Sequence, residues 1–183
     1  MLETLEKLGF LSTENGQISN QDKIILLHIY NSKINGEKVN AQQIAQVLDT
    51  DASVSDEQFA SQIKAAHKVL AERKLQEVDN EKLGSSRLFE KMEERVQGLK
   101  GAFEEKKIEF ETMRGVLENE QNFDAFCQKT NLSANKDMVK KALQKKFDDT
   151  KADYLKQKVG CLSVGVDFAA WADARAGKYS LAL

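Results

Sequence analysis

Few side chains in this sequence are of the kinds that do chemistry, and those few stand apart from one another. The two histidines, His28 and His67, fall on predicted helices, and neither has a cysteine or carboxylate at metal-ligand spacing such as His-Glu-x-x-His. Cys127 follows a phenylalanine and is expected to be a small core residue. Cys161, close to Lys158, is a candidate nucleophile for which no triad can be assembled. The sequence therefore predicts no catalytic residue, no metal site and no cofactor.

One acidic loop has the spacing of oxygen ligands. The stretch Asp49-Thr-Asp-Ala-Ser-Val-Ser-Asp-Glu resembles the calcium loop of the EF-hand family at its first, third and fifth positions. Val54 stands where that family needs glycine for a sharp turn, and Ala60 stands where its bidentate glutamate belongs. We therefore expect a helix-capping loop that does not bind calcium.

Two further features bear on phosphate binding. Residues 136–158 hold eight lysines against four aspartates, which suits a phosphate ligand, a solvated face, or packing against the acidic segment 1–22. Gly98, Gly101 and Gly115 do not have the spacing of a phosphate-binding loop. They interrupt a predicted helix, and we expect them to permit bending or the close approach of another helix.

The stretch that must position everything else runs from residue 89 to residue 117. Its apolar residues recur at alternating steps of three and four, with Lys106 as the one charged exception, and charged or small residues fill the gaps. The seam residues are Phe89, Met92, Val96, Leu99, Phe103, Lys106, Phe110, Met113 and Leu117. This pattern predicts one long helix with a narrow apolar seam.

A second long helix supplies the expected partner for this seam. It is predicted to begin after Ser133 or Asn135 and to end near Val159, where Gly160 stops it. Its apolar stripe is formed by Val139, Leu143, Phe147 and Tyr154. We expect the seam to pack on this stripe within one chain, with self-association through the remaining apolar surface.

Shorter elements surround the two long helices, and the absence of proline favours helices joined by short links. The predicted helices are residues 2–8, 21–32 with Asn20 as cap, 41–48, 55–74, 119–130 and 167–177 with Asp167 as cap. Strand character is predicted at 75–78 and 161–166, and turns at 15–16 and 79–86.

Residues 21–92 resemble the winged helix-turn-helix superfamily in their order of elements. The resemblance is carried by the apolar helix from Ile24 to Ile29, Val39, the segment 42–48, the helix from Phe59 to Leu70, and 75–78 before a wing. In that superfamily the third helix enters the major groove of DNA. The resemblance implies outward-facing contact residues on the helix 55–74, namely Gln58, Ser61, Gln62, Lys64 and Lys68.

Charge argues against strong nucleic-acid binding by this segment. Residues 23–85 hold eight basic against nine acidic side chains, and the wing offers only Lys82 and Arg87. Neutralising phosphates dominates DNA affinity, so few basic residues mean weak binding. Winged helices also serve as protein-interaction modules, which suits a neutral segment better.

The composition of the chain limits the classes of protein to which it can belong. The 183 residues are 41% apolar and 31% charged with a net charge of −2, which allows a core and a surface of interspersed signs. No run approaches the ~18 apolar residues of a membrane span, and the acidic N-terminus lacks the pattern of a signal peptide. With two unrelated cysteines, we expect an intracellular, cytoplasmic protein without a membrane span.

These patterns together predict a mainly all-α fold. We expect a small helical, winged-helix-like domain over residues 1–85, and a long-helix hairpin or bundle with a short C-terminal helix over 86–183. The expected function is non-enzymatic: protein–protein interaction or assembly, with a protein partner or a second copy of the chain. The alternative is a nucleic-acid-binding transcriptional regulator that uses the N-terminal domain, with the long helix as dimer arm. An enzyme ranks third.

Overall fold

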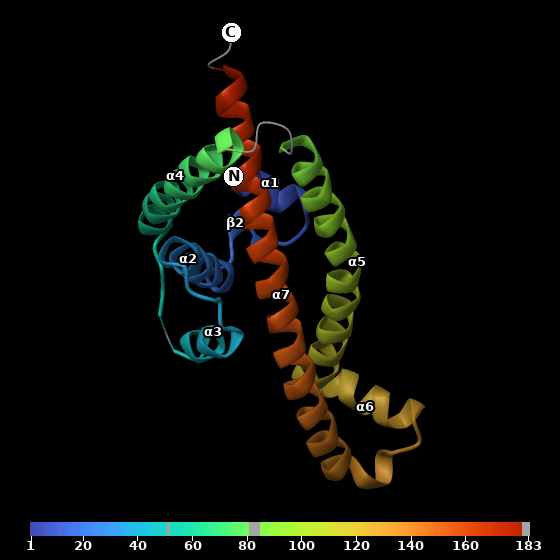
Figure 1. Cartoon of the computed structure of the whole chain (residues 1–183). Helices are drawn as coiled ribbons and strands as arrows, with labels where there is room; N and C mark the ends of the chain where they lie inside the picture. Colours follow the sequence, from blue (N-terminus) through green and yellow to red (C-terminus); the bar gives the residue numbers. More distant parts are fainter. Residues whose placement is uncertain (51, 81–84, 181–183) are drawn as a thin grey trace. The chain divides into compact units, whose positions relative to one another are not determined.

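The computed structural model describes residues 1–50, 52–80 and 85–180, and most of them are helical (Figure 1). The prediction of a mainly all-α fold is confirmed. The helices are α1 (Leu2–Lys7), α2 (Asn20–Asn35), α3 (Ala41–Leu48), α4 (Asp56–Asn80), α5 (Ser85–Glu118), α6 (Glu120–Lys129) and α7 (Lys136–Ser180). A 3-10 turn, Ser133–Asn135, precedes α7, and two short strands, β1 (Thr13–Glu14) and β2 (Gln17–Ile18), pair antiparallel.

The chain divides into two compact units. Unit 1 comprises residues 1–100 and 158–183, and unit 2 comprises residues 101–157. The long helices α5 and α7 contribute residues to both units.

Glycine, asparagine and serine residues determine the turns and the helix ends at the start of unit 1. Gly9, with φ of 74°, adopts the left-handed conformation that ends α1. Asn15 and Gly16 have φ values of 52° and 78°, as a two-residue hairpin of type I′ between β1 and β2 requires. The predicted cap of α2 is wrong by one residue, because the Ser19 hydroxyl accepts the hydrogen bond from the backbone N–H of Asp22.

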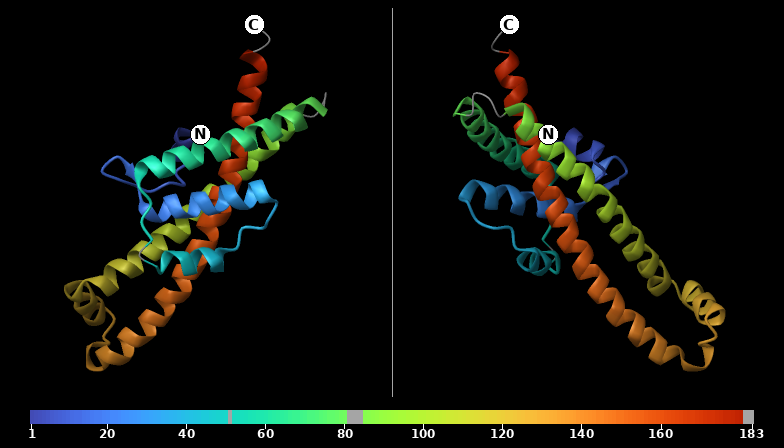
Figure 2. Two further views of the ribbon diagram at one scale, coloured as in Figure 1. Left: turned by 90° about the vertical axis from the view of Figure 1, so that its left-hand side faces the viewer. Right: turned by 45° about the vertical axis from the view of Figure 1, so that its right-hand side comes forward.

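The core of unit 1 gathers apolar side chains from α1, α2, α3, α4 and the parts of α5 and α7 that belong to it. α4 lies alongside α2 in both views of Figure 2, and Phe89 of α5 stacks on Phe168 of α7 with ring centroids 5.0 Å apart. The fully buried side chains of this core include Leu5, Phe10, Ile25, Leu26, Ile29, Ile44, Ile63, Val96, Leu162 and Val166.

Several further predictions about secondary structure in this unit are wrong. Residues 75–78 continue α4 as helix, where a strand was expected, because Leu75, Gln76 and Glu77 are good helix formers. Gly160 does not stop α7, and 161–166 are helical, so Asp167 lies inside a helix and caps nothing. The turn or wing predicted over 79–86 falls partly on residues 81–84, outside the described residues, and its other residues, 79–80 and 85–86, are helical.

Unit 2 is a helical hairpin with a short third helix. Residues 101–118 of α5 run antiparallel to residues 136–157 of α7, and α6 joins them through the turn at 130–135 (Figures 1 and 2). Phe110 stacks between Phe147 and Tyr154, with centroid distances of 5.3 and 4.7 Å. The stripe predicted on the second helix therefore fills this part of the seam within one chain.

Candidate functional site

His67 joins three helices through two hydrogen bonds. Its Nδ1 lies 2.8 Å from the Tyr30 hydroxyl on α2, and its Nε2 lies 2.6 Å from Oδ2 of Asp173 on α7. A neutral imidazole offers one donor and one acceptor, so a Tyr30 hydroxyl that donates and an Nε2–H that donates satisfy both contacts. Burial raises the pKa of Tyr30, and the charges of Asp173 and Asp167 raise it further. Because Tyr30 is fully buried, the arrangement suits packing and orientation of helices.

Of the remaining candidate groups for chemistry, the two cysteines are buried in the core. Burial raises the pKa of the Cys161 thiol to about 11, so the thiol is protonated at neutral pH and is a poor nucleophile. Cys127 is also buried, as expected for a core residue, and His28 is half-buried on α2. Among the described residues, no three or more histidine, cysteine or acidic side chains are grouped to hold a metal ion.

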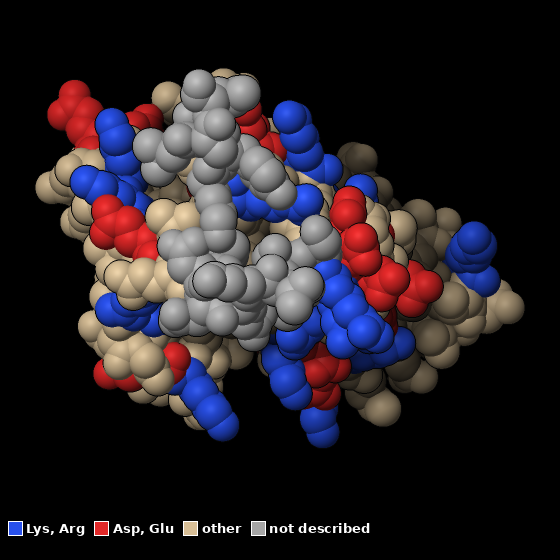
Figure 3. All heavy atoms as spheres, turned by 45° about the horizontal axis from the view of Figure 1, so that its top comes forward, with Lys and Arg blue, Asp and Glu red and all other residues tan. Residues whose placement is uncertain are grey.

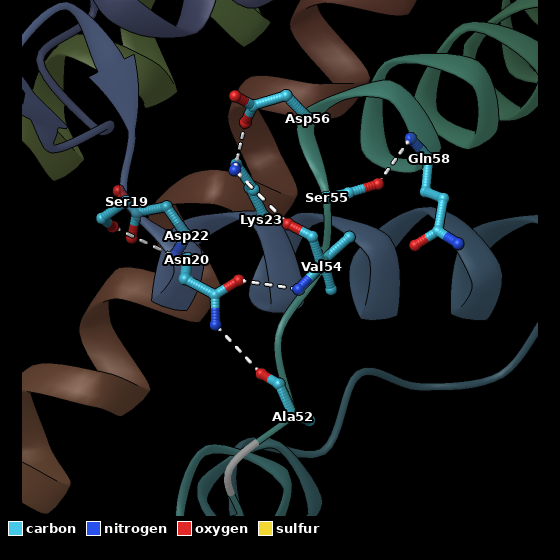
Figure 4. Close-up of polar contacts among 9 residues, drawn as sticks. All are labelled: Ser19, Asn20, Asp22, Lys23, Ala52, Val54, Ser55, Asp56 and Gln58. Carbon is cyan, nitrogen blue, oxygen red and sulfur yellow. Dashed lines mark hydrogen bonds and ion pairs between the residues drawn. The ribbon is translucent and has the colours of Figure 1, made fainter.

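The loop that resembles a calcium site connects α3 to α4 and is fastened to α2. Figure 4 shows the Val54 backbone N–H donating to Oδ1 of Asn20, at 3.0 Å, and the Lys23 ammonium binding the Asp56 carboxylate. The third loop position, Asp51, lies outside the described residues. The Asp56 carboxylate thus neutralises a lysine of the same unit, and Asn20, predicted as a helix cap, fixes the loop instead.

An ion pair that the sequence does not predict lies in the core of unit 1. The ammonium of Lys158 on α7 contacts Oδ1 of Asp22 on α2, and both side chains are buried. Oδ2 of Asp22 accepts the backbone N–H of Ser12 at 2.6 Å. The two partners are 136 positions apart, so the sequence does not show that they pair. The only signal in the sequence is that each charged residue stands close to a run of apolar residues.

The seam is covered to different degrees along α5. Val96 and Phe103 are buried, whereas the other described seam side chains are half-buried, namely Phe89, Met92, Leu99, Lys106, Phe110, Met113 and Leu117. Lys106 keeps its ammonium 2.9 Å from the carboxylate of Glu109, one turn along the same helix. That hydrogen bond raises the pKa of Lys106 and lowers the pKa of Glu109.

The face of α5 opposite the seam carries what we call the acidic ridge. Its members recur at steps of three and four along unit 2: Gly101, Glu104, Glu105, Ile108, Glu111, Thr112 and Gly115. Ile108 in its middle is 62% exposed. A Cβ added at Gly101 or Gly115 would meet no atom within 4 Å, so within this chain these glycines do not serve the close helix approach that we expected.

The far end of the same hairpin carries what we call the basic tip, residues 128–147. It holds six lysines against one aspartate. Leu132 and Met138 are 41% and 72% exposed there. No ion pair joins Lys141 or Lys145 to any other described residue, whereas Lys136 pairs with Asp124 of α6 at 2.6 Å. The basic tip therefore combines unneutralised positive charge with exposed apolar surface.

The residues proposed for nucleic-acid contact do lie at the surface of α4. Gln58, Gln62, Lys64 and Lys68 are exposed, and Lys68 is 3.9 Å from the carboxylate of Glu72 on the next turn. On the face drawn in Figure 3, basic and acidic side chains lie side by side. A surface on which basic and acidic side chains alternate is what the net charge of −2 led us to expect.

Comparisons with known proteins give no relatives: no family model matches the chain, and no curated protein or solved structure matches it significantly. Within the described residues, no helix combines the length and the apolar character needed to cross a membrane.

Proposed function

We propose that this protein is a non-enzymatic assembly protein that associates with further copies of itself through the helical faces of unit 2. The proposal depends mainly on the distribution of exposed large apolar side chains between the two units. Among the described residues, four such side chains are more than a third exposed, and Ile108, Leu132 and Met138 of these lie in unit 2. Single exposed apolar residues are common, but their concentration in one part of a protein marks an interaction site.

The filled seam supports the same proposal. Phe103, Phe110, Phe147 and Tyr154 already pack on one another within unit 2, so the seam itself is not the surface left for a partner. A two-helix hairpin buries only one side of each long helix, and its outer faces remain available. Pairing these faces with helices of another copy, in the manner of a coiled coil or bundle, would bury the exposed apolar residues.

Charge favours protein contact over the nucleic-acid alternative. The exposed face of α4 that would read DNA mixes Lys64 and Lys68 with Glu57 and Glu72. DNA affinity comes largely from phosphate neutralisation, which a balanced face supplies poorly. Protein interfaces tolerate such a mixture of signs at their rims.

The proposal is tested by placing a charge in the exposed apolar surface. Ile108→Glu should leave the helical content and the melting temperature nearly unchanged, because the side chain is exposed, and should lower the mass measured by light scattering towards that of the monomer. Val69→Glu, at an exposed apolar position in unit 1, is the matched control and should leave the mass unchanged. A mass that is the same for the wild type and Ile108→Glu would contradict a role for this face.

A further inference from the structure

We infer that the assembly contact is heterologous: the basic tip of one copy docks on the acidic ridge of the next. This inference rests on the proposed function and names the two surfaces that meet. It concerns residues 101–115 and 128–147, all within unit 2.

The acidic ridge offers a surface of one sign around an apolar centre. Glu104, Glu105 and Glu111 flank Ile108, and the ridge contains no lysine or arginine. Gly101 and Gly115, one helical heptad to either side of Ile108, have open space where a side chain would be. Each exposed glycine costs the helix about 1 kcal/mol relative to alanine, and nothing within this unit uses the space that the two provide. A partner that comes close to the α5 backbone would use it.

The ridge does not suit a copy of itself. Antiparallel pairing of two ridges about Ile108 would bring Glu105 of one copy towards Glu111 of the other. Like charges opposed at an interface are unfavourable, and they suppress such a pairing. The ridge therefore calls for a basic partner surface that also presents an apolar side chain.

The basic tip has the chemistry that the ridge requires. Lys141 and Lys145 lie one turn apart on α7, and Met138 stands one turn before them with 72% of its surface exposed. Every residue from 128 to 138 is exposed, so the tip is accessible. Met138 against Ile108, with lysines against glutamates around them, would give an apolar centre with complementary charges at its rim.

When the basic tip of one copy binds the acidic ridge of another, the resulting dimer still has one free tip and one free ridge. Such contacts close into rings or continue as open chains, according to the rotation that each contact imposes. The inference therefore predicts growth beyond a dimer as concentration rises. It also predicts weakening by salt, because exposed charges are screened.

Two charge-reversal variants test the contact. The tip variant carries Lys141→Glu and Lys145→Glu, and the ridge variant carries Glu105→Lys and Glu111→Lys. Each variant alone should lose self-association by at least about tenfold, because glutamates at 141 and 145 would oppose the glutamates of the ridge, and lysines at 105 and 111 would oppose the lysines of the tip. An equimolar mixture should associate again, since the glutamates introduced at 141 and 145 can then meet the lysines introduced at 105 and 111, while the unaltered tip and ridge still match.

The matched control reverses two lysines of the same helix outside the tip. Lys151→Glu with Lys156→Glu makes the same change in net charge at exposed positions, and its self-association should be close to that of the wild type. Circular dichroism melts should be similar for all variants, because all the altered side chains are at least partly exposed.

The outcomes separate the inference from the proposed function. A wild type that remains a monomer would overturn the proposed function and, with it, the contact. A wild type that associates while the tip variant associates equally well would overturn only the contact. Failure of the mixture to associate would also overturn it. If the tip bound vesicles of phosphatidylcholine and phosphatidylserine, or duplex DNA, while the wild type stayed monomeric, the occupant would be an anionic surface and the inference would be wrong.

Discussion

Asp22 and Lys158 illustrate how single buried groups hold the helices of unit 1 together. Their ion pair lies in the core of unit 1 with both side chains buried, and Oδ2 of Asp22 also accepts the backbone N–H of Ser12. Moving two charges out of water is costly, so a buried pair adds little net stability even when its geometry is good. Removing one partner is different, because the other charge then stays in the core.

Asp22→Ala should therefore lower the free energy of unfolding by about 3–5 kcal/mol, since the ammonium of Lys158 loses its carboxylate while it remains buried. Chemical denaturation monitored by circular dichroism measures the change. The double variant Asp22→Leu with Lys158→Met removes both charges and should recover much of that loss. A loss below about 1 kcal/mol for Asp22→Ala would mean that the pair is reached by water.

His67 shows what sequence reasoning could and could not supply at this scale. The sequence shows that His67 lies on a helix without a partner at metal-ligand spacing, and the structure gives it hydrogen bonds to Tyr30 and Asp173. The partners themselves could not be predicted, because they lie 37 and 106 positions away and meet His67 only through tertiary packing. Local patterns carry information about caps and faces but not about such pairings.

At the scale of elements, α7 is where local signals and tertiary packing disagree. Gly160 and the β-branched residues Val164 and Val166 predicted a break and a short strand. The structure continues the helix because Leu162, Val166 and Ala169 recur on one side and are buried in unit 1. A glycine costs a helix only about 1 kcal/mol, which the burial of two aliphatic side chains exceeds.

Gly160 and Gly165, two glycines of α7 that lie in unit 1, give a matched test. A Cβ at Gly165 would lie 2.7 Å from Cδ2 of Leu5 and 3.3 Å from Cδ2 of Phe10, both of which are buried. Gly165→Ala should destabilise unit 1 by about 1–3 kcal/mol, because a packed core resists added volume. Gly160→Ala meets no atom within 4 Å and should stabilise the same helix by up to about 1 kcal/mol.

Thermal melts of these two variants, with the wild type alongside, read out the difference. Equal stabilisation by both alanines would show that α1 does not lie against α7 at Gly165. Equal destabilisation would show that α7 is not helical around Gly160.

The long helices could be predicted from the sequence more easily than the exposed faces of those helices that remain available to a partner. The heptad spacing from Phe89 to Leu117 predicts α5 because one side of the helix is apolar throughout. The acidic ridge is the opposite side of that helix, and in the sequence its glutamates look like any solvated face. Only the structure reveals that Ile108 is exposed and that a Cβ added at Gly101 or Gly115 would have open space around it.

At the scale of the whole molecule, the net charge of −2 conceals a local separation of charge. The basic tip holds six lysines against one aspartate, while every charged residue of the acidic ridge is a glutamate. A chain that carries complementary surfaces on one unit can assemble with itself without a large net charge. Such assembly depends on concentration and on ionic strength, since its attraction is partly between exposed charges.

The central claim, that the seam is filled within the chain and the outer faces of unit 2 bind further copies, is tested most directly by the mass of the wild-type protein in solution. Sedimentation velocity over a series from low micromolar to high micromolar concentration, at low and at high salt, measures it. The account predicts a weight-average mass that rises above the monomer's 20.6 kDa with concentration and falls back as salt is added. A mass of 20.6 kDa at every concentration and both salt levels would contradict it.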